Sequence, residues 1–339
     1  MSHLFYQSHS SIRPIYPPML NYSSMHSSSP ALTLLLLLGC AGVTNPPLQS
    51  VEPFAMVLGI AQDGGLPHAG CNREHCVAAA RDPSLRRHVA SLAIVDPVTD
   101  QRWLLDATPD FPHQLRMLDE AYPIDAPSPG LAGIFLTHAH IGHYTGLMHL
   151  GREVLGSRGV PVFAMPRMKR FLESNGPWDQ LVRLGNIAIQ PLEEGARVRL
   201  NERIAITPFL VPHRDEYSET VGFRIEGPSR TILFIPDIDK WSRWERRIED
   251  LVREADVALV DGTFFDAAEL PGRDMSEIPH PFIVESLAAF SALPPEDRSK
   301  VVFIHLNHSN PALDPTTGAS RVIEDAGMRV AVERERIAL

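Results

Sequence analysis

A short apolar run, Gly133-Ile134-Phe135-Leu136, leads directly into three closely spaced histidines, His138, His140 and His143. Such a run is typical of a buried β-strand, so the histidines are expected at the end of a strand. Imidazole is a common ligand of zinc, iron and related ions. A single histidine is usually only a hydrogen-bonded side chain, but three at this spacing on a rigid strand end can converge on one ion. The segment therefore predicts a metal site at the edge of a sheet.

Three more residues of ligand type follow apolar runs in the same way. They are His213 after residues 206–212, Asp237 after residues 231–236, and His305 after residues 301–304. A core strand would hold each backbone while the side chain faces an open edge, which is the support that a metal ligand needs. Taken singly, each could be an ordinary turn residue at the end of a strand. Together with the clustered histidines they predict a site for one or two divalent metals.

Composition restricts the kind of partner. The chain has 339 residues and a formal net charge of −10, without a long run of lysine or arginine. Binding to nucleic acid requires clustered cations that neutralise phosphates, so the composition argues against it. Hydrophobic residues make up 44% of the chain, which excludes wholesale disorder, and the three cysteines are too few for a disulfide-dense fold. We expect a small-molecule substrate, and the oligomeric state is left open.

The first 40 residues resemble an export leader rather than part of the fold. Residues 31–42 are apolar but too short for a membrane span, which needs about 20 residues, and they fit the apolar region of a secretion signal. The run ends in Leu37-Leu38-Gly39-Cys40, which resembles a bacterial lipobox. This implies lipidation at Cys40 and a periplasmic lipoprotein anchored to the membrane by its lipid, with residues 41–53 as a tether. The alternatives are a buried apolar helix or a mistranslated leader, in which case the protein would be cytoplasmic.

From residue 54 to residue 339 the sequence contains no internal linker, low-complexity tract or tandem repeat. Runs rich in Val, Ile, Leu and Phe alternate with turns and are typical of strands. The expected strands are residues 55–60, 91–96, 102–106, 133–137, 161–165, 204–211, 231–235, 257–260 and 300–305. Helical patterns fall at residues 146–154, 168–174, 243–254 and 284–291. Strands on both sides of helices predict an α/β fold, with two sheets packed face to face and helices outside.

The six candidate ligands resemble those of the metallo-β-lactamase superfamily. They match its H-x-H-x-D-H motif, its later histidine, its bridging aspartate and its final histidine in order. Asp106, at the end of another apolar run, matches an aspartate that supports the histidine loop. Segments 61–67, 70–76, 260–264, 278–280 and 303–311 resemble the branch of coenzyme PQQ synthesis protein B, with PhnP-like phosphodiesterases as more distant relatives. The resemblance covers roughly residues 54–339 and implies an αββα sandwich in a single domain, with the metals at one edge of the sheets.

Gly142 departs from the family pattern, because the family has a metal-binding aspartate at this place. The ligands left for a second metal are two histidines and one carboxylate, His143, Asp237 and His305. Such a set is typical of non-haem iron(II) sites, but it could also be a weak second zinc site. His308 or Asp110 could fill the gap. Alternatively, only a first site binds metal, formed by His138, His140, His213 and Asp237. Members of the PQQ branch often lack one or more of the first three histidines, so this chain is expected to be more metal-competent than they are.

The resemblance also assigns roles beyond the ligands. A divalent metal lowers the pKa of bound water to near 7 and so supplies hydroxide at neutral pH. Asp237 would bridge the metals and help to hold the hydroxide, and a general acid would protonate the leaving group. His280 is the candidate acid, because a histidine from a comparable place serves this role in PhnP-like and RNase Z-like relatives; alternatively it is an exposed loop histidine. Asp261 either orients a ligand histidine or forms a turn, and His308 is a ligand, an orienting group or a substrate contact.

A separate cluster of two cysteines and two histidines precedes these ligands. His68, Cys71, His75 and Cys76 lie within nine residues and could bind a structural zinc ion. The PQQ branch has a cysteine-rich zinc loop at this place, although the C-x4-C spacing here is wider. In an oxidising compartment Cys71 and Cys76 could instead form a disulfide. We favour zinc.

Three functions are consistent with these residues, since the fold alone does not choose among them. The leading hypothesis is a metallo-hydrolase that uses metal-bound hydroxide on an ester, phosphodiester or lactone. The second is an iron-dependent oxidative enzyme linked to PQQ biosynthesis, which the missing aspartate at residue 142 favours. The third is a non-catalytic metal-binding lipoprotein. Zinc is the expected metal, with iron or manganese as alternatives.

Overall fold

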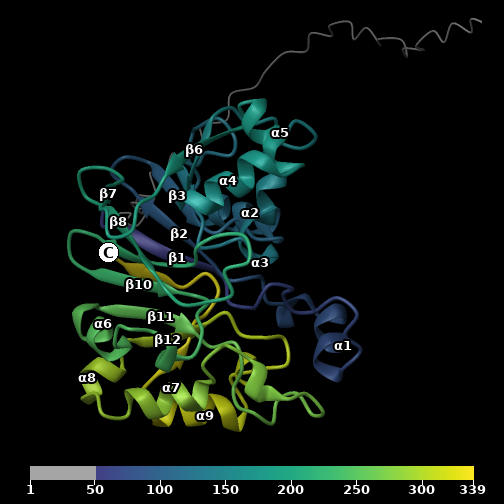
Figure 1. Cartoon of the computed structure of the whole chain (residues 1–339), viewed down its shortest axis with the longest axis vertical. Helices are drawn as coiled ribbons and strands as arrows, with labels where there is room; N and C mark the ends of the chain where they lie inside the picture. Colours follow the sequence, from purple (N-terminus) through teal and green to yellow (C-terminus); the bar gives the residue numbers. More distant parts are fainter. Residues whose placement is uncertain (1–50) are drawn as a thin grey trace, which may run out of the picture. The chain divides into compact units, whose positions relative to one another are not determined.

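Short apolar strands build two β-sheets that pack face to face (Figure 1). The structure is a computed structural model that describes residues 51–339, apart from the side chain of Ser276. Within this range each sheet has seven strands, in the orders β14-β1-β2-β3-β4-β5-β6 and β13-β12-β11-β10-β9-β8-β7. The described residues, 51–339, belong to one compact unit.

The elements have the following bounds. The first sheet contains β1 (Phe54–Gly59), β2 (Ser91–Asp96), β3 (Gln101–Leu105), β4 (Gly133–Phe135), β5 (Val160–Ala164), β6 (Ile187–Pro191) and β14 (Arg336–Ala338). The second contains β7 (Val198–Arg199), β8 (Ala205–Leu210), β9 (Val221–Glu226), β10 (Thr231–Ile235), β11 (Val257–Asp261), β12 (Val301–Ile304) and β13 (Arg329–Val330). The α-helices are α1 (Glu74–Arg81), α2 (Phe111–Ala121), α3 (Ile141–Tyr144), α4 (Pro166–Ser174), α5 (Trp178–Arg183), α6 (Ile248–Glu254), α7 (Ile283–Phe290), α8 (Pro295–Arg298) and α9 (Gly318–Asp325). The 3-10 turns are η1 (Pro83–Leu85), η2 (Thr145–Leu150), η3 (Trp241–Arg243), η4 (Met275–Glu277) and η5 (Pro311–Leu313).

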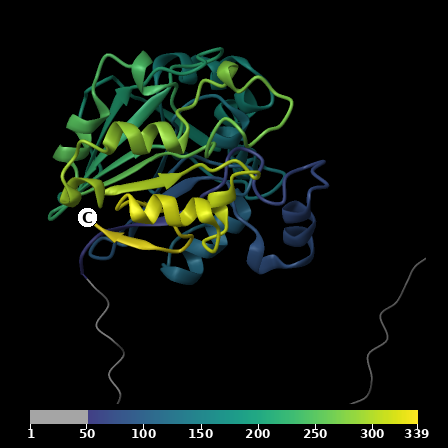
Figure 2. The ribbon, with the colours of Figure 1, turned by 90° about the horizontal axis from the view of Figure 1, so that it is seen from below.

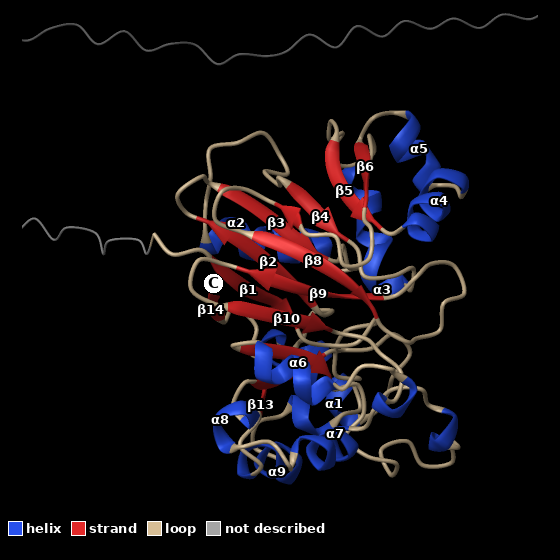
Figure 3. Cartoon of the chain, turned by 60° about the vertical axis from the view of Figure 1, so that its left-hand side comes forward, coloured by secondary structure: helices blue, strands red, loops and turns tan. Residues whose placement is uncertain are grey.

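The alternation of side chains along β1 explains the layers. Ala55 and Val57 belong to the apolar cluster between the two sheets, together with Phe223 of β9. Met56 and Leu58 point the other way and pack in a cluster that also holds apolar side chains of α2 and α4. All four β1 side chains are fully buried, as expected for a strand covered on both faces. Each sheet is therefore sandwiched between the other sheet and a layer of helices (Figure 3).

Parallel crossovers bring the ends of several strands to one edge. Strands β3, β4, β5 and β6 pair in parallel, and so do β10, β11, β12 and β13. Helices connect these strands, and Figure 2 shows α7 and α9 on the outer side of the second sheet. In a parallel α/β layer the loops that follow the strands form the ligand-binding edge. Most of the candidate ligands lie in these loops, whereas His213 follows the antiparallel strand β8.

The predicted α/β sandwich is confirmed, and each expected strand contains or overlaps a strand of the structure. Two expected helices are shorter than predicted. Residues 146–154 form only the 3-10 turn η2, and residues 243–254 become helical only from Ile248, at the start of α6. The predicted leader, including Cys40, and most of the tether lie outside the described residues. Among the residues that the structure describes, no helix is both long enough and apolar enough to cross a membrane.

Candidate metal centre

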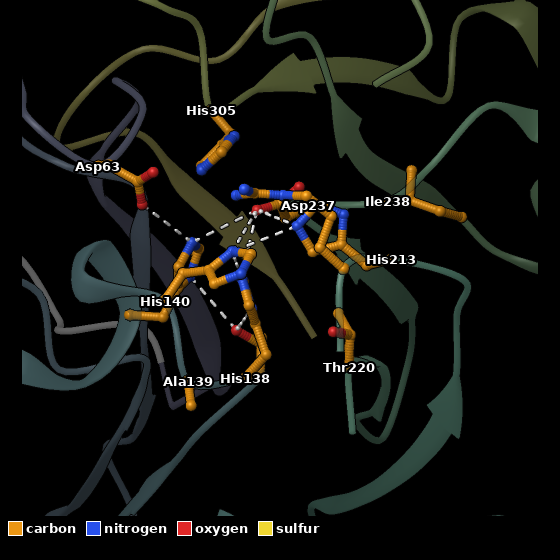
Figure 4. A network of polar contacts seen from close by, with 12 residues as sticks. Asp63, His138, Ala139, His140, His213, Thr220, Asp237, Ile238 and His305 are labelled. Carbon is orange, nitrogen blue, oxygen red and sulfur yellow. Dashed lines mark hydrogen bonds and ion pairs between the residues drawn. The ribbon is translucent and has the colours of Figure 1, made fainter. Parts of the chain in front are cut away.

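Most candidate ligands follow strands of the two sheets. Asp106 and residues 137–143 follow β3 and β4 of the first sheet, whereas Asp237 and His305 follow β10 and β12 of the second. Because parallel strands end at the same edge, these side chains meet where the edges of the two sheets adjoin. Figure 4 shows the resulting group of side chains around Asp237.

His138, His140, His213 and Asp237 direct four ligand atoms at one point. His140 Nδ1 lies 2.9 Å from His138 Nε2 and 3.3 Å from His213 Nε2. Asp237 Oδ2 lies 3.3 Å from each of these Nε2 atoms. In a tetrahedral zinc site with bonds of about 2.0–2.1 Å, neighbouring ligand atoms are about 3.3 Å apart, so the spacing fits a zinc ion. The structure thus brings together the first predicted group of ligands.

Polar groups lie behind the three imidazoles, next to the ring nitrogen that faces away from this point. They are Thr137 Oγ1 at 3.0 Å from His138 Nδ1, Asp239 Oδ1 at 3.3 Å from His213 Nδ1, and Glu216 Oε2 at 3.0 Å from His140 Nε2. Such partners orient metal-binding histidines and raise their basicity. Sequence reasoning identified neither Asp239 nor Glu216, because both depend on loop positions rather than on a motif.

A second group, formed by Asp63, His143 and His305, lies beside the first. Its ligand atoms are within 4.8 Å of one another, with His143 Nε2 3.6 Å from Asp63 Oδ1. Asp106 Oδ2 lies 2.7 Å from His143 Nδ1, and Thr263 Oγ1 lies 3.0 Å from His305 Nδ1, so both Nε2 atoms face the group. These Nε2 atoms and Asp63 Oδ1 are buried without a hydrogen-bond partner among the described residues. Buried polar atoms are rarely unpaired, so this group also fits a cation.

Asp63 occupies the gap that the sequence left beside Gly142, and the two residues proposed for that gap lie elsewhere. Asp110 Oδ2 accepts a hydrogen bond of 2.9 Å from the backbone N–H of Val89. The ring of His308 stacks on that of His68, with centroids 4.2 Å apart. The expectation that either residue fills the gap is therefore wrong. The signal for Asp63 was present in the sequence, since it is a carboxylate shortly after an apolar strand.

The charges of the cluster show how it behaves without a cation. Burial raises the pKa of Asp237, but the neighbouring His213 and His280 outweigh it and hold this pKa well below its usual range. Burial lowers the pKa of His213, yet Asp237 and Asp239 raise it to about 10. In the same way the carboxylates around His143, Asp106 foremost, overcome its burial and raise its pKa to about 9. The buried carboxylates thus favour protons on the neighbouring histidines, and a divalent cation could replace such protons.

His280 lies next to Asp237 and is buried, which excludes the alternative of an exposed loop histidine. Its Nδ1 atom is 2.8 Å from Asp261 Oδ2 and 3.2 Å from Asp237 Oδ1. Burial lowers its pKa, but Asp261 and Asp237 outweigh this effect and raise the pKa above its usual value. Asp261 also accepts a 2.7 Å hydrogen bond from the Thr263 hydroxyl, which in turn contacts His305. Asp261 therefore contacts His280 directly and the ligand His305 only through Thr263.

The cysteine cluster contains a different histidine from the one predicted. Cys71, His75, Cys76 and His308 place their ligand atoms within 4.8 Å of one another. His68 is not one of the four, because its ring stacks on His308 and its Nδ1 lies 3.0 Å from the carbonyl oxygen of Ala69. The loop after β12 brings His308 to the start of α1, which no local spacing could reveal. Cys71 and Cys76 are free thiols, and burial, aided by Cys71, raises the pKa of Cys76 to about 11.

Comparisons with known proteins agree with this architecture. The beta-lactamase superfamily domain matches residues 101–306, and the chain belongs to that superfamily. Within it, the chain is similar to coenzyme PQQ synthesis protein B. It is 27% identical over 313 residues to the protein of Methylococcus capsulatus, covering 84% of this chain and 99% of that one. It is 30% identical over 296 residues to the protein of Pseudomonas savastanoi pv. phaseolicola, covering 77% of this chain and 91% of the relative.

Solved structures show the same fold. Zinc-bound PqqB from Methylobacterium extorquens superposes with a TM-score of 0.71 at 21% identity, covering 84% of this chain and all (100%) of that one. A diphosphatase of the PhnP family superposes with a TM-score of 0.59 at 19% identity, covering 85% and 97%. The metallo-β-lactamase fold and the PqqB-like branch expected from the sequence are therefore confirmed.

Proposed function

We propose that the chain is a metal-dependent hydrolase that acts on an ester, phosphodiester or lactone. One observation carries the proposal: two neighbouring ligand groups adjoin the same buried carboxylate. Asp237 Oδ2 is 3.3 Å from His138 Nε2 in the first group and 3.8 Å from His143 Nε2 in the second. This is the arrangement that two-metal hydrolases use, with a carboxylate between two cations about 3.5–4 Å apart.

The residues divide the work of hydrolysis in this proposal. A divalent cation, when bound, lowers the pKa of a coordinated water and polarises the substrate oxygen beside it. His138, His140, His213 and Asp237 would hold the first cation. His280 would donate a proton to the leaving group, because Asp261 and Asp237 raise its pKa and so favour the protonated ring. Asp261 would fix the orientation of that ring through its 2.8 Å contact with Nδ1.

The proposal is tested with the full chain, loaded with zinc and assayed on bis(4-nitrophenyl) phosphate, 4-nitrophenyl acetate and a γ-lactone. His138→Ala removes one ligand of the first group and should abolish turnover while the protein remains folded. His113→Ala is the matched control, because His113 lies exposed on α2. Full activity of His138→Ala, or no hydrolysis of any substrate class by the zinc-loaded chain, would reject the proposal.

A second candidate is an iron-dependent oxidative enzyme linked to PQQ biosynthesis. It is favoured by the similarity to coenzyme PQQ synthesis protein B and by the two histidines and one carboxylate of the second group. Such a set suits non-haem iron(II) with open positions. Oxygen consumption that requires iron(II), is abolished by His305→Ala and survives in His138→Ala would favour this candidate over hydrolysis.

We propose zinc for the first group and for the Cys71/Cys76 cluster, because tetrahedral nitrogen and sulfur ligands suit that ion; iron or manganese are alternatives in the second group. We also propose that the segment ending at Cys40 exports the protein and anchors it by a lipid on the periplasmic side. Partition of the wild-type chain, but not of Cys40→Ser, into a detergent phase would support the anchor. Equal partition of the two would argue against it.

A further inference from the structure

Asp63 and residue 142 compete for the same space. Gly142 lies in α3, on the loop that carries the three clustered histidines. A Cβ atom on Gly142 would lie 2.1 Å from Asp63 Oδ1 and 2.7 Å from Asp63 Cα, which is too close for any side chain. The family aspartate missing at residue 142 could therefore not be accommodated here, because a carboxylate from a distant part of the chain already fills its place.

Backbone hydrogen bonds fix the loop that carries Asp63 beside the final ligand histidine. The N–H of Gln62 donates to the carbonyl of Leu306, and the N–H of Leu306 donates to the carbonyl of Ile60, each at 2.8 Å. The end of β1 in the first sheet is thus joined to the residue that follows His305 in the second. A turn then closes with a 2.8 Å bond from Gly65 N–H to the Gln62 carbonyl. Asp63 projects from this fixed turn.

The Asp63 carboxylate points at nitrogen atoms that have no hydrogen-bond partner among the described residues. Its Oδ1 atom, His143 Nε2 and His305 Nε2 are all buried and unpaired among the described residues, and the three lie within 4.8 Å of one another. In the view of Figure 4, Asp63 and His305 lie on one side of Asp237 and His213 on the other. Three unpaired ligand atoms converging on one point indicate a site for a cation rather than a hydrogen-bond network.

We propose that Asp63 is the carboxylate ligand of the second cation, supplied from the loop after β1 in place of the aspartate that Gly142 lacks. The second ligand set is then Asp63, His143 and His305, with Asp237 at the boundary to the first group. The glycine at residue 142 is required by this arrangement, because only the absence of a Cβ leaves room for Asp63. The inference rests on the metal centre of the proposed function, but it does not depend on which bond is cleaved.

The test is the metal content of the full chain, measured by elemental analysis after zinc loading and removal of excess metal. Asp63→Ala should bind one zinc fewer than the wild type, or bind it more than about 100-fold more weakly, since loss of a mere outer partner of a ligand already costs about 10–100-fold. Asp110→Asn is the control and should keep the full zinc content, because asparagine can still accept the hydrogen bond from Val89. Circular dichroism establishes that each variant is folded.

Two further variants separate loss of a ligand from damage to the fold. Asp63→Asn keeps the size of the side chain but removes its charge, so it should bind the second zinc more weakly while the protein remains folded. Gly142→Ala should be destabilised or lose the second zinc, because its Cβ would lie 2.1 Å from Asp63 Oδ1 and 2.7 Å from Asp63 Cα. Cobalt substitution gives an independent readout, since the visible spectrum should change with loss of the second ion. Full zinc content and affinity in Asp63→Ala would overturn the inference. A wild-type chain that loads no cation on the His138 group would instead reject the proposed function itself.

Discussion

His280 has a buried ring with two neighbouring carboxylates, and this environment suits the role of general acid proposed for it. Asp261 and Asp237 raise its pKa despite its burial, and this favours the protonated form of the ring. A general acid of this kind matters most when the leaving group is a poor one. The charge on His280 is therefore expected to affect the protonation of the leaving group, and not the binding of metal.

We predict that His280→Gln lowers kcat by about 10²–10⁴-fold for substrates with an alcohol leaving group. For 4-nitrophenyl esters the loss should be much smaller, because 4-nitrophenolate leaves without protonation. The measurement compares kcat for the two substrate types in the wild type and the variant, at unchanged zinc content. An equal loss for both leaving groups would mean that His280 only positions other groups.

Glu269, in the loop after β11, is a partly buried carboxyl group outside the candidate metal centre. Its Oε2 atom accepts a 2.7 Å hydrogen bond from the backbone N–H of Phe265, and its Oε1 atom accepts one of 2.5 Å from the Ser309 hydroxyl. Burial outweighs these bonds and raises its pKa from 4.5 to about 7. The folded protein therefore holds a proton on Glu269 in a pH range where the unfolded chain has lost it.

Glu269 should consequently destabilise the protein as the pH rises. Its contribution to the free energy of unfolding is fully present below about pH 4.5 and is lost as the pH rises through about 7. Glu269→Gln cannot ionise. Its free energy of unfolding relative to that of the wild type should therefore rise by about 2–3 kcal/mol between pH 5 and pH 8. Urea unfolding of both proteins at the two pH values measures this change. A stability difference that does not vary with pH would contradict the prediction.

At the scale of elements, Arg102 ties β3 to the segment that leads into β4. The Arg102 side chain is buried and forms an ion pair of 2.7 Å with Asp119. The Asp119 side chain, in contrast, is 54% exposed. The guanidinium also donates to the carbonyls of Tyr122, Pro129 and Gly130, at 3.1, 3.2 and 3.1 Å. The buried guanidinium therefore supplies the hydrogen bonds of these carbonyls, whereas the Asp119 carboxylate stays partly exposed to solvent.

We predict that Arg102→Ala and Asp119→Asn differ strongly in stability although they remove the same ion pair. Loss of the buried guanidinium leaves buried carbonyls unpaired and should cost about 3–5 kcal/mol. Loss of the exposed carboxylate should cost less than about 1 kcal/mol. Thermal and urea unfolding of the two variants gives the comparison. Similar destabilisation by both would show that the ion pair itself, rather than the capping of the carbonyls, holds this segment.

The strands that could be predicted from the sequence are those buried on both faces. β10 and β11 read as continuous apolar runs because sheet and helices cover them on opposite sides. β9 escaped prediction because Gly222 and Arg224 interrupt its apolar pattern, and pairing with β8 and β10 holds it as a strand. The edge strand β6 was not predicted either, because its last two residues are exposed and its sequence lacks a continuous apolar run.

The candidate ligands also divide into those that the sequence predicts and those that only the structure reveals. The sequence predicts His138, His140 and His143 as ligands, because their spacing and the strand before them are local features. Asp63 could not be matched to its partners, because its place depends on the hydrogen bonds that join the loop after β1 to Leu306. Local motifs thus predict ligands that share a loop, and only the packing of the sheets reveals those that do not.

At the scale of the whole molecule, the candidate metal centre lies where the two sheets meet. Asp63 and His138 come from segments of the first sheet, and His213 and His305 from segments of the second. A cation held by both sets would connect the two halves of the sandwich at this edge. Such a cation binds the folded chain far better than the unfolded one, because the ligands converge only after both sheets have formed.

Removal of metal should therefore lower the Tm of the entire described unit rather than melt one loop. Zinc at about 100 times its Kd should add about 2.7 kcal/mol to the free energy of unfolding, and the gain should rise with the logarithm of free zinc. Calorimetry of the chelated full chain at several zinc concentrations measures this shift, with Cys71→Ser as background so that the cysteine cluster does not contribute. His113→Ala should keep the shift, whereas His138→Ala combined with His305→Ala should lose most of it. If the Tm in that background were independent of zinc, the cation could not be what connects the two sheets. The edge would then be held by apolar packing and by hydrogen bonds between the sheets, such as those joining the loop after β1 to Leu306 and Val221 to Thr137.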